Sequence, residues 1–219
     1  MKDIKKIIEL DFLSIMPYFT IKNLFIYLCF GIFYSYISKT AVVVFGIGLL
    51  MSVVFSTYPF MVGEVSGIDA LYSLCGISRK KVVSGRYMTA FLLSVINTLL
   101  CSVFAYIMSV VFKLEFNIGI FAVTAVYSAI LMMLMIMIQY PVYFKLGHTK
   151  GRISAAILMI LFFIVIATAV SFSDNITDIF VKNPDLGIRV IIPTTIAIVT
   201  ISYIVSKRLS IRFYEKRDF

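Results

Sequence analysis

The chain has 219 residues, of which 61% are hydrophobic and 14% are charged, and it carries a net charge of +9. Soluble domains average about half apolar and about a quarter charged residues, so this composition predicts an integral membrane protein with no room for a soluble catalytic domain. We attribute the excess of positive charge to membrane topology, as developed below, and not to binding of nucleic acid.

Six long apolar stretches follow one another along the sequence. Each is near the roughly 20 residues that a helix needs to cross a hydrocarbon core of about 30 Å. Lipid offers no hydrogen bonds to the backbone, so we expect all six to be helical. The predicted fold class is all-α, with a single domain over residues 1–219 and a six-helix bundle over residues 21–206. The stretches are Ile21–Ser38, Ala41–Val62, Tyr87–Phe112, Ile118–Phe144, Ile153–Phe172 and Ile188–Ser206.

An amphipathic segment precedes the first stretch. Residues 1–16 place apolar side chains at helical spacing, interrupted by Asp11, and Pro17 follows the segment. This pattern predicts a helix that lies in the membrane interface and ends before the first span. The apolar positions are Ile4, Ile7, Ile8, Phe12 and Ile15.

The basic residues are distributed unevenly between the two sides of the predicted membrane. Sixteen of the 20 Lys and Arg fall on the side of the N-terminus, including those of the basic tail 207–219. The other side receives Lys39, Lys113, Lys182 and Arg189. By the positive-inside rule, both termini are predicted to be cytoplasmic. The longest segment on the outer side is then Ser173–Gly187, with Asp174 and Asp178.

Several sequence features argue against intrinsic catalysis. No charged residue falls in the interior of a predicted span, which disfavours an ion-coupled carrier, and no phosphate-binding GxxxxGK[ST] motif occurs. His148 is the only histidine and the three cysteines form no close pair, so we expect no metal and no cofactor of its own. Asn97 and Gln139 are the strongest polar groups within the spans, where they either join helices by hydrogen bonds or contact a substrate.

The first predicted cytoplasmic loop begins at Gly63. Asp69 to Cys75 form a short helix with an apolar side, and Ser78 is positioned as the N-cap of the helix that leads into the third span. An exposed apolar helix face indicates a protein partner; the alternative is that this basic loop touches anionic lipid.

Two motifs carry a resemblance. Two segments resemble the cytoplasmic loops of ABC-2 type permeases: Glu64, Tyr72–Leu74, Ile77–Val83 and Arg86-Tyr87 in the first loop, and the turn Tyr140–Arg152. Cys75-Gly76 departs from a common Leu-Pro pair. The resemblance implies a subunit of a bacterial plasma-membrane ABC exporter that has no ATPase site. It also implies pairing with an identical or homologous membrane subunit, and a separate ATPase subunit that binds the ATP.

The same resemblance assigns roles to residues. It makes Asp69–Ser78 the main ATPase-coupling segment and Lys145–Gly151 the minor one. The coupling residues are then Asp69, Leu71, Tyr72, Cys75, Ser78, Arg79, Lys145, Gly147 and Lys150. Asn97, Gln139 and Tyr106, which belongs to the aromatic-rich third span, are candidates for the translocation path.

Within the family, the chain is similar to the small membrane subunits of the staphylococcal exporter of phenol-soluble modulins, which implies amphipathic peptide cargo. Two alternatives remain open at this point: a non-transporting membrane protein, such as an immunity or assembly factor, and an ATP-independent carrier.

Overall fold

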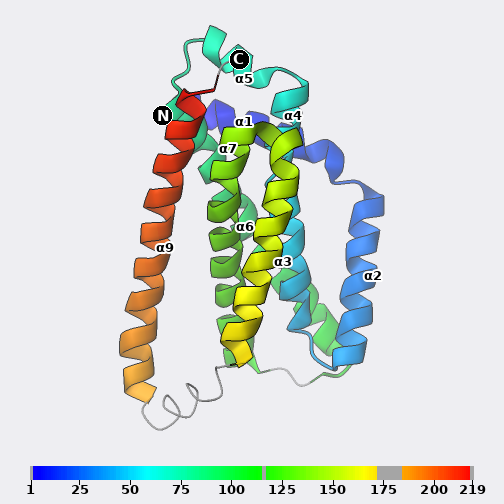
Figure 1. The fold of residues 1–219 in the computed structure, drawn as a ribbon. Coiled ribbons are helices and arrows are strands. Elements are labelled where there is room, and N and C mark those ends of the chain that lie inside the picture. The colour runs from blue at the N-terminus through cyan, green and yellow to red at the C-terminus, as the bar shows by residue number, and fades with distance from the viewer. Residues whose placement is uncertain (1, 115–116, 172–183, 218–219) are drawn as a thin grey trace. The chain divides into compact units, whose positions relative to one another are not determined.

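The computed structural model describes residues 2–114, 117–171 and 184–217, and every regular element in them is helical (Figure 1), which confirms the all-α class. The elements are α1 (Lys2–Ile15), η1 (Met16–Tyr18), α2 (Ile21–Ser38), α3 (Val43–Phe55), α4 (Tyr58–Val65), α5 (Ile68–Leu74), α6 (Arg79–Val111), α7 (Ile118–Ser171) and α9 (Pro184–Glu215).

Five stretches of helix are long and apolar enough to cross a membrane: Ile21–Ser38, Val43–Val65, Arg79–Val111, Ile118–Ile164 and Pro193–Glu215. The fourth and fifth predicted spans both lie in α7. The structure divides into two compact units, Met1–Ile136 with Asp218–Phe219 (unit 1) and Met137–Arg217 (unit 2), and each is described by itself.

The first hairpin of unit 1 agrees with the sequence. Helix α2 has the predicted bounds, with Thr20 as its N-cap accepting a hydrogen bond from the Asn23 backbone N–H at 3.4 Å. Lys39 ends α2 in the left-handed conformation, at φ 53°, and Lys113 does the same after α6, at φ 50°. A left-handed residue at this position is a common way to stop a helix and reverse the chain.

The second predicted span, Ala41–Val62, corresponds to the apolar stretch Val43–Val65 but is interrupted. Helix α3 ends at Phe55, and Pro59 lies in the first turn of α4, which continues to Val65. Proline is tolerated there because the first N–H groups of a helix have no intrahelical acceptor. With α5 following at Ile68, the expected loop after Gly63 is therefore mostly helical.

Small residues bring α3 and α6 close together within unit 1. Gly48 faces Cys101 so closely that a Cβ atom at this position would collide with the Cys101 sulfur. Asn97 Nδ2 donates to the Gly48 carbonyl oxygen at 3.0 Å, a hydrogen bond of the kind that holds membrane helices together. An apolar cluster continues this contact: Ala41, Val44, Phe45, Cys101, Ala105 and Met108.

Unit 2 contains a sharp break in α7. Gly147 has φ 76° and ψ 178°, and the 54-residue α7 is helical on both sides of it. Figure 1 shows the chain turning back at this point of α7. Only glycine adopts this backbone region without strain. The expected loop Phe144–Arg152 is thus a one-residue break between helices, tightened by the Tyr143 ring stacking on His148 with centroids 5.8 Å apart.

The basic tail is helical over most of its length. Helix α9 runs on to Glu215, because its last turns are packed within unit 2. The Tyr214 ring meets Phe144 edge-on at 5.2 Å between centroids, and the Ser206 hydroxyl donates to the Met137 carbonyl. The expected outer segment Ser173–Gly187 lies largely outside the described residues, as do Asp174, Asp178 and Lys182.

Candidate functional site

Helices of unit 1 converge on the buried side chain of Arg86, in the second turn of α6. Its Nη2 donates to Asp69 Oδ1 of α5 at 2.9 Å, and only 2% of the Arg86 side chain and 7% of the Asp69 side chain are exposed. Its guanidinium carbon lies 4.4 Å from the centroid of the Phe60 ring of α4, a cation–π contact that burial strengthens. A Cβ atom at Gly63 would lie 2.8 Å from Nη2, so α4 needs glycine there.

Helix α1 adds a second carboxylate to this group. Asp11 is 3% exposed, and its Oδ2 accepts a hydrogen bond from Thr89 Oγ1 of α6 at 3.1 Å. Ile7 and Ile15, one turn before and one turn after Asp11, are buried with it where α1 packs on α4 and α6. We call Asp11, Asp69, Arg86 and Thr89 the charged cap of unit 1.

Burial sets the protonation behaviour of the charged cap. Loss of water raises the pKa of Asp11 to about 6, against the opposing effects of Arg86 and of the Thr89 hydrogen bond. Burial likewise raises the pKa of Tyr72, on α5, to about 12, so this phenol stays neutral. Asp3 differs: Lys81 holds the pKa of this exposed carboxyl below its usual value through a 2.6 Å ion pair.

The charged cap was missed from the sequence. The sequence places Arg86 in a basic cytoplasmic loop and Asp11 as an interruption of an apolar stripe, whereas both side chains are buried. An absence of charge in the predicted spans does not exclude these buried ionisable groups, because α6 begins eight residues before the predicted third span. The available signal was the i, i+4 spacing of Ile7, Asp11 and Ile15, which puts all three on one helix face.

The structure separates the predicted residues of the main coupling segment into two groups. Asp69 and Tyr72 are buried, whereas Leu71 is 52% exposed and Leu74, beside it on α5, is 86% exposed. Cys75 is also exposed. The short helix predicted here is confirmed as α5.

The connection from α5 to α6 is as expected in position. Ser78 is the N-cap of α6, with Arg79 as the first helical residue. The cap acts through the backbone, because the Ser78 side chain makes no capping hydrogen bond while its carbonyl accepts from the N–H groups of Lys81 and Val82.

The predicted minor coupling residues belong to unit 2. Gly147 is buried at the break in α7, and Lys145 and Lys150 on either side are exposed. The Lys145 ammonium lies 5.3 Å from the centroid of the Phe213 ring of α9. This contact joins α7 and α9 near the basic residues of unit 2.

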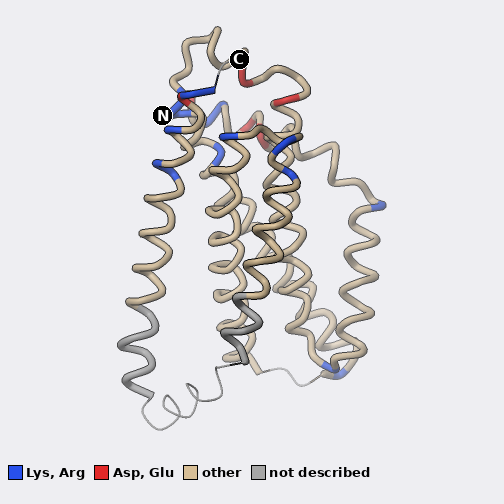
Figure 2. The backbone as a smooth tube through the Cα atoms, in the orientation of Figure 1, with Lys and Arg blue, Asp and Glu red and all other residues tan. Residues whose placement is uncertain are grey.

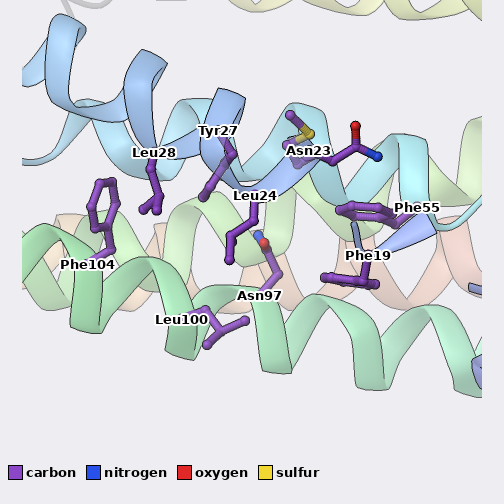
Figure 3. A pocket seen from close by; sticks show the side chains of 10 residues that line it. Phe19, Asn23, Leu24, Tyr27, Leu28, Phe55, Asn97, Leu100 and Phe104 are labelled. Atoms are coloured by element: carbon purple, nitrogen blue, oxygen red, sulfur yellow. The ribbon is translucent and has the colours of Figure 1, made fainter. Parts of the chain in front are cut away.

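Two of the three candidates for a translocation path, Asn97 and Tyr106, lie in unit 1 and do not line a common cavity. Asn97 lines a cavity of about 180 Å³ between α2, α3 and α6 (Figure 3). Tyr106 is 55% exposed and does not line it, and Gln139 lies in unit 2, buried, with its Oε1 lacking a hydrogen-bond partner among the described residues. The cavity is lined by Phe19, Asn23, Leu24, Tyr27, Leu28, Met51, Phe55, Asn97, Leu100 and Phe104.

Charge is segregated along the helices of each unit. In unit 1, Lys22 and Arg79 stand at the starts of α2 and α6, while Lys39 and Lys113 stand at their ends. The acidic residues of unit 1 drawn in Figure 2 lie at the end of the helices that carries α1, α4 and α5. Within the described residues, no group of three His, Cys, Asp or Glu side chains is arranged to hold a metal ion.

Long apolar helices with charge gathered at their ends define a multi-pass helical membrane protein. The family model described as ABC-2 family transporter protein matches residues 6–215, and the chain belongs to this family. Its members are membrane transport components, generally not catalytic themselves, that associate with an ATPase subunit. No curated protein and no solved structure matches the chain.

Proposed function

We propose that the chain is the membrane-spanning subunit of an ATP-driven ABC exporter in the bacterial plasma membrane. It forms the translocation path with a second membrane subunit, identical or homologous, and a separate ATPase binds the ATP. Both termini are cytoplasmic, and the two arms of α7 cross the membrane separately, giving six crossings. The break at Gly147 and the basic residues Lys145 and Lys150 beside it support this topology.

The observation that carries the proposal is the two-sided character of α5. One side is anchored to α6 by the buried pair of Asp69 with Arg86, and the other side exposes Leu71 and Leu74. An ATPase surface that docks on these leucines is thereby connected to α6, because a displacement of α5 acts on Arg86 directly. The turn at Gly147 provides the second, smaller contact through Lys145 and Lys150.

Helix α1 lies in the membrane interface through a different face from the one the sequence predicted. The stripe that contains Ile7 and Ile15 packs against protein, whereas Leu10, Leu13 and Met16 are exposed, Leu13 at 61% and Met16 at 71%. We place this second edge in the interfacial layer of the bilayer, where partly apolar helices bind.

The proposed cargo is amphipathic or hydrophobic, such as a cytolytic peptide. The cavity beside Asn97 supports this, because its lining is mainly apolar and its volume of about 180 Å³ suits a small apolar group; an apolar protein cavity of about 150 Å³ admits benzene. Exposed aromatic side chains along α2, Phe25, Phe30, Phe33, Tyr34 and Tyr36, offer an apolar surface of the same kind.

Retention of the ATPase subunit by variants of α5 tests the coupling role. Leu74→Asp and Leu71→Asp should leave insertion and folding unchanged, since both side chains are exposed, and should abolish co-purification of the ATPase because a charge then replaces apolar contact area. Val65→Asp is the matched control, since Val65 is 84% exposed but lies outside α5. Tyr72→Asp is unsuitable because Tyr72 is buried.

Full retention of the ATPase by both leucine variants would contradict docking on α5. Absence of any co-purified ATPase with the unmodified chain would favour a non-transporting membrane protein.

The energy source is tested separately after reconstitution with the ATPase. Unit 1 holds buried ionisable groups, so an absence of charge is no ground for expecting ATP-driven transport. We expect it because the chain belongs to the ABC-2 family. Cargo should move with ATP when the proton gradient is collapsed, and a catalytically inactive ATPase should stop it. Flux driven by a pH gradient without nucleotide would indicate a carrier.

A further inference from the structure

Asp11 is the most weakly compensated charge site in the charged cap. It is 3% exposed, and among the described residues Thr89 is its only hydrogen-bond partner. Arg86, the nearest source of positive charge on α6, directs its Nη2 to Asp69. Two carboxylates therefore share the surroundings of one guanidinium, and an ionised Asp11 would leave buried negative charge in excess, which is costly.

The hydrogen bonds of Thr89 indicate how this excess is avoided. Its hydroxyl oxygen lies 3.1 Å from Asp11 Oδ2 and 3.2 Å from the Gly85 carbonyl oxygen, and both are acceptors when Asp11 is ionised. A hydroxyl has a single proton to donate. If Asp11 is protonated, its O–H donates to Thr89, the Thr89 O–H donates to Gly85, and both distances are accounted for.

The other titratable groups around Asp11 do not supply the missing positive charge. Helix α5 contributes Asp69 and the neutral Tyr72, and Glu64 of α4 is exposed. On α1 itself, the exposed Lys5 pairs loosely with Glu9 at 3.8 Å, and Asp3 pairs with Lys81. Lys6 is exposed.

We propose that Asp11 takes up a proton when α1 packs on α4 and α6, so that docking of α1 is linked to pH. On release, the carboxyl group loses its proton to water and α1 loosens as the ionised side chain seeks solvent. Uptake of a proton on docking agrees with the pKa of Asp11, which burial raises from 3.8 to about 6. A raised pKa means that the stabilisation is fully present below about 3.8 and is lost as the pH rises through about 6.

Accessibility of a cysteine on the buried face of α1 measures this linkage. The full chain, with Cys29, Cys75 and Cys101 replaced by serine and Ile7→Cys introduced, is placed in lipid nanodiscs and treated with a pyridyl disulfide, which reacts at acidic pH. The rate is divided by that of Lys6→Cys, a solvent-exposed position on the same helix, which cancels the pH dependence of the reagent. The relative rate should rise with pH by up to about tenfold per unit between pH 4 and 6 and level off above.

Variants of the two partners identify the group responsible. Asp11→Asn should remove the pH dependence and keep α1 docked at pH 7.5, whereas Glu9→Gln, which neutralises an exposed carboxylate on the same helix, should leave the curve unchanged. Thr89→Val, which removes the hydroxyl that contacts Asp11, should shift the pH at which the relative rate levels off, and Thr89→Ser, which keeps a hydroxyl there, should not. The proposal would be overturned if the relative labelling rate did not change with pH in the protein that keeps Asp11, Glu9 and Thr89. It would also be overturned if Asp11→Asn left the pH dependence unchanged. The measurement needs no ATPase, so it stands apart from the coupling role of α5.

Discussion

The two segments proposed to meet the ATPase use the same kind of contact in opposite environments. In unit 1, the Arg86 guanidinium lies 4.4 Å from the Phe60 ring and is 2% exposed. In unit 2, the Lys145 ammonium lies 5.3 Å from the Phe213 ring, on an exposed side chain. The first cation is committed to a buried carboxylate, whereas the second is solvated.

The difference shows how each segment holds its shape. The segment around α5 depends on charge pairing, because removing any member leaves another charge buried without compensation. The segment around Gly147 depends on a backbone conformation and on aromatic packing by Tyr143, Phe144 and Tyr214. Mutations should therefore act on the two segments through different mechanisms and with different magnitudes.

The largest effect is expected for Arg86→Met. This change leaves Asp69 buried without its cation and should destabilise the protein by about 3–5 kcal/mol, measured by thermal or denaturant unfolding of the purified chain. The double variant Asp69→Leu with Arg86→Met should recover most of the loss, because a buried ion pair can be replaced by apolar side chains at little cost. A double variant as unstable as the single one would show that packing, and not charge pairing, holds α5.

An intermediate effect is expected for Gly147→Ala. Alanine disfavours φ 76° with ψ 178°, so the change should cost about 1–3 kcal/mol, read as a lowered midpoint of unfolding. Gly46→Ala is the matched control, because a Cβ atom there meets nothing within 4 Å, and in helix α3 alanine should stabilise by about 0.5–1 kcal/mol. Equal tolerance at both glycines would mean that the break in α7 does not require its unusual backbone angles.

The smallest effect is expected for Lys145→Gln. An exposed cation over an aromatic ring contributes about 0.5–1 kcal/mol, so the loss of stability should be within this range and should shrink further at high salt. Lys150→Gln, which removes an equally exposed charge of the same turn, serves as the control. A loss from Lys145→Gln comparable with that from Arg86→Met would remove the contrast between the two segments.

Much of the fold was predictable because lipid imposes helices on long apolar stretches. The bounds of α2, the short turn at Lys39 and the helix α5 agree with expectation. Helix ends at the polar boundaries were less predictable: α6 starts at Arg79 and α9 continues to Glu215. Hydropathy loses its signal once a helix leaves the apolar stretch, while the backbone can continue to be helical as long as tertiary packing supports it.

The candidate site was predictable only in part. Sequence reasoning located α5 and its apolar side, and it named Asp69 and Tyr72 among the residues to face the ATPase, but both side chains are buried. The separation of an anchored side from the exposed Leu71 and Leu74 depends on where Arg86 lies, seventeen residues beyond Asp69.

The sequence by itself determined that this is a helical membrane protein of the ABC-2 type. The length and apolarity of its segments and its loop motifs are local properties of the chain, and an apolar segment that crosses lipid has to satisfy its own backbone hydrogen bonds as a helix. Only the tertiary structure decided that Asp11, Asp69 and Arg86 form one buried group. These residues are far apart in the chain, and which of several charged side chains becomes buried is settled by the packing of α1 and α5 on α6, where desolvation makes each charge depend on its neighbours.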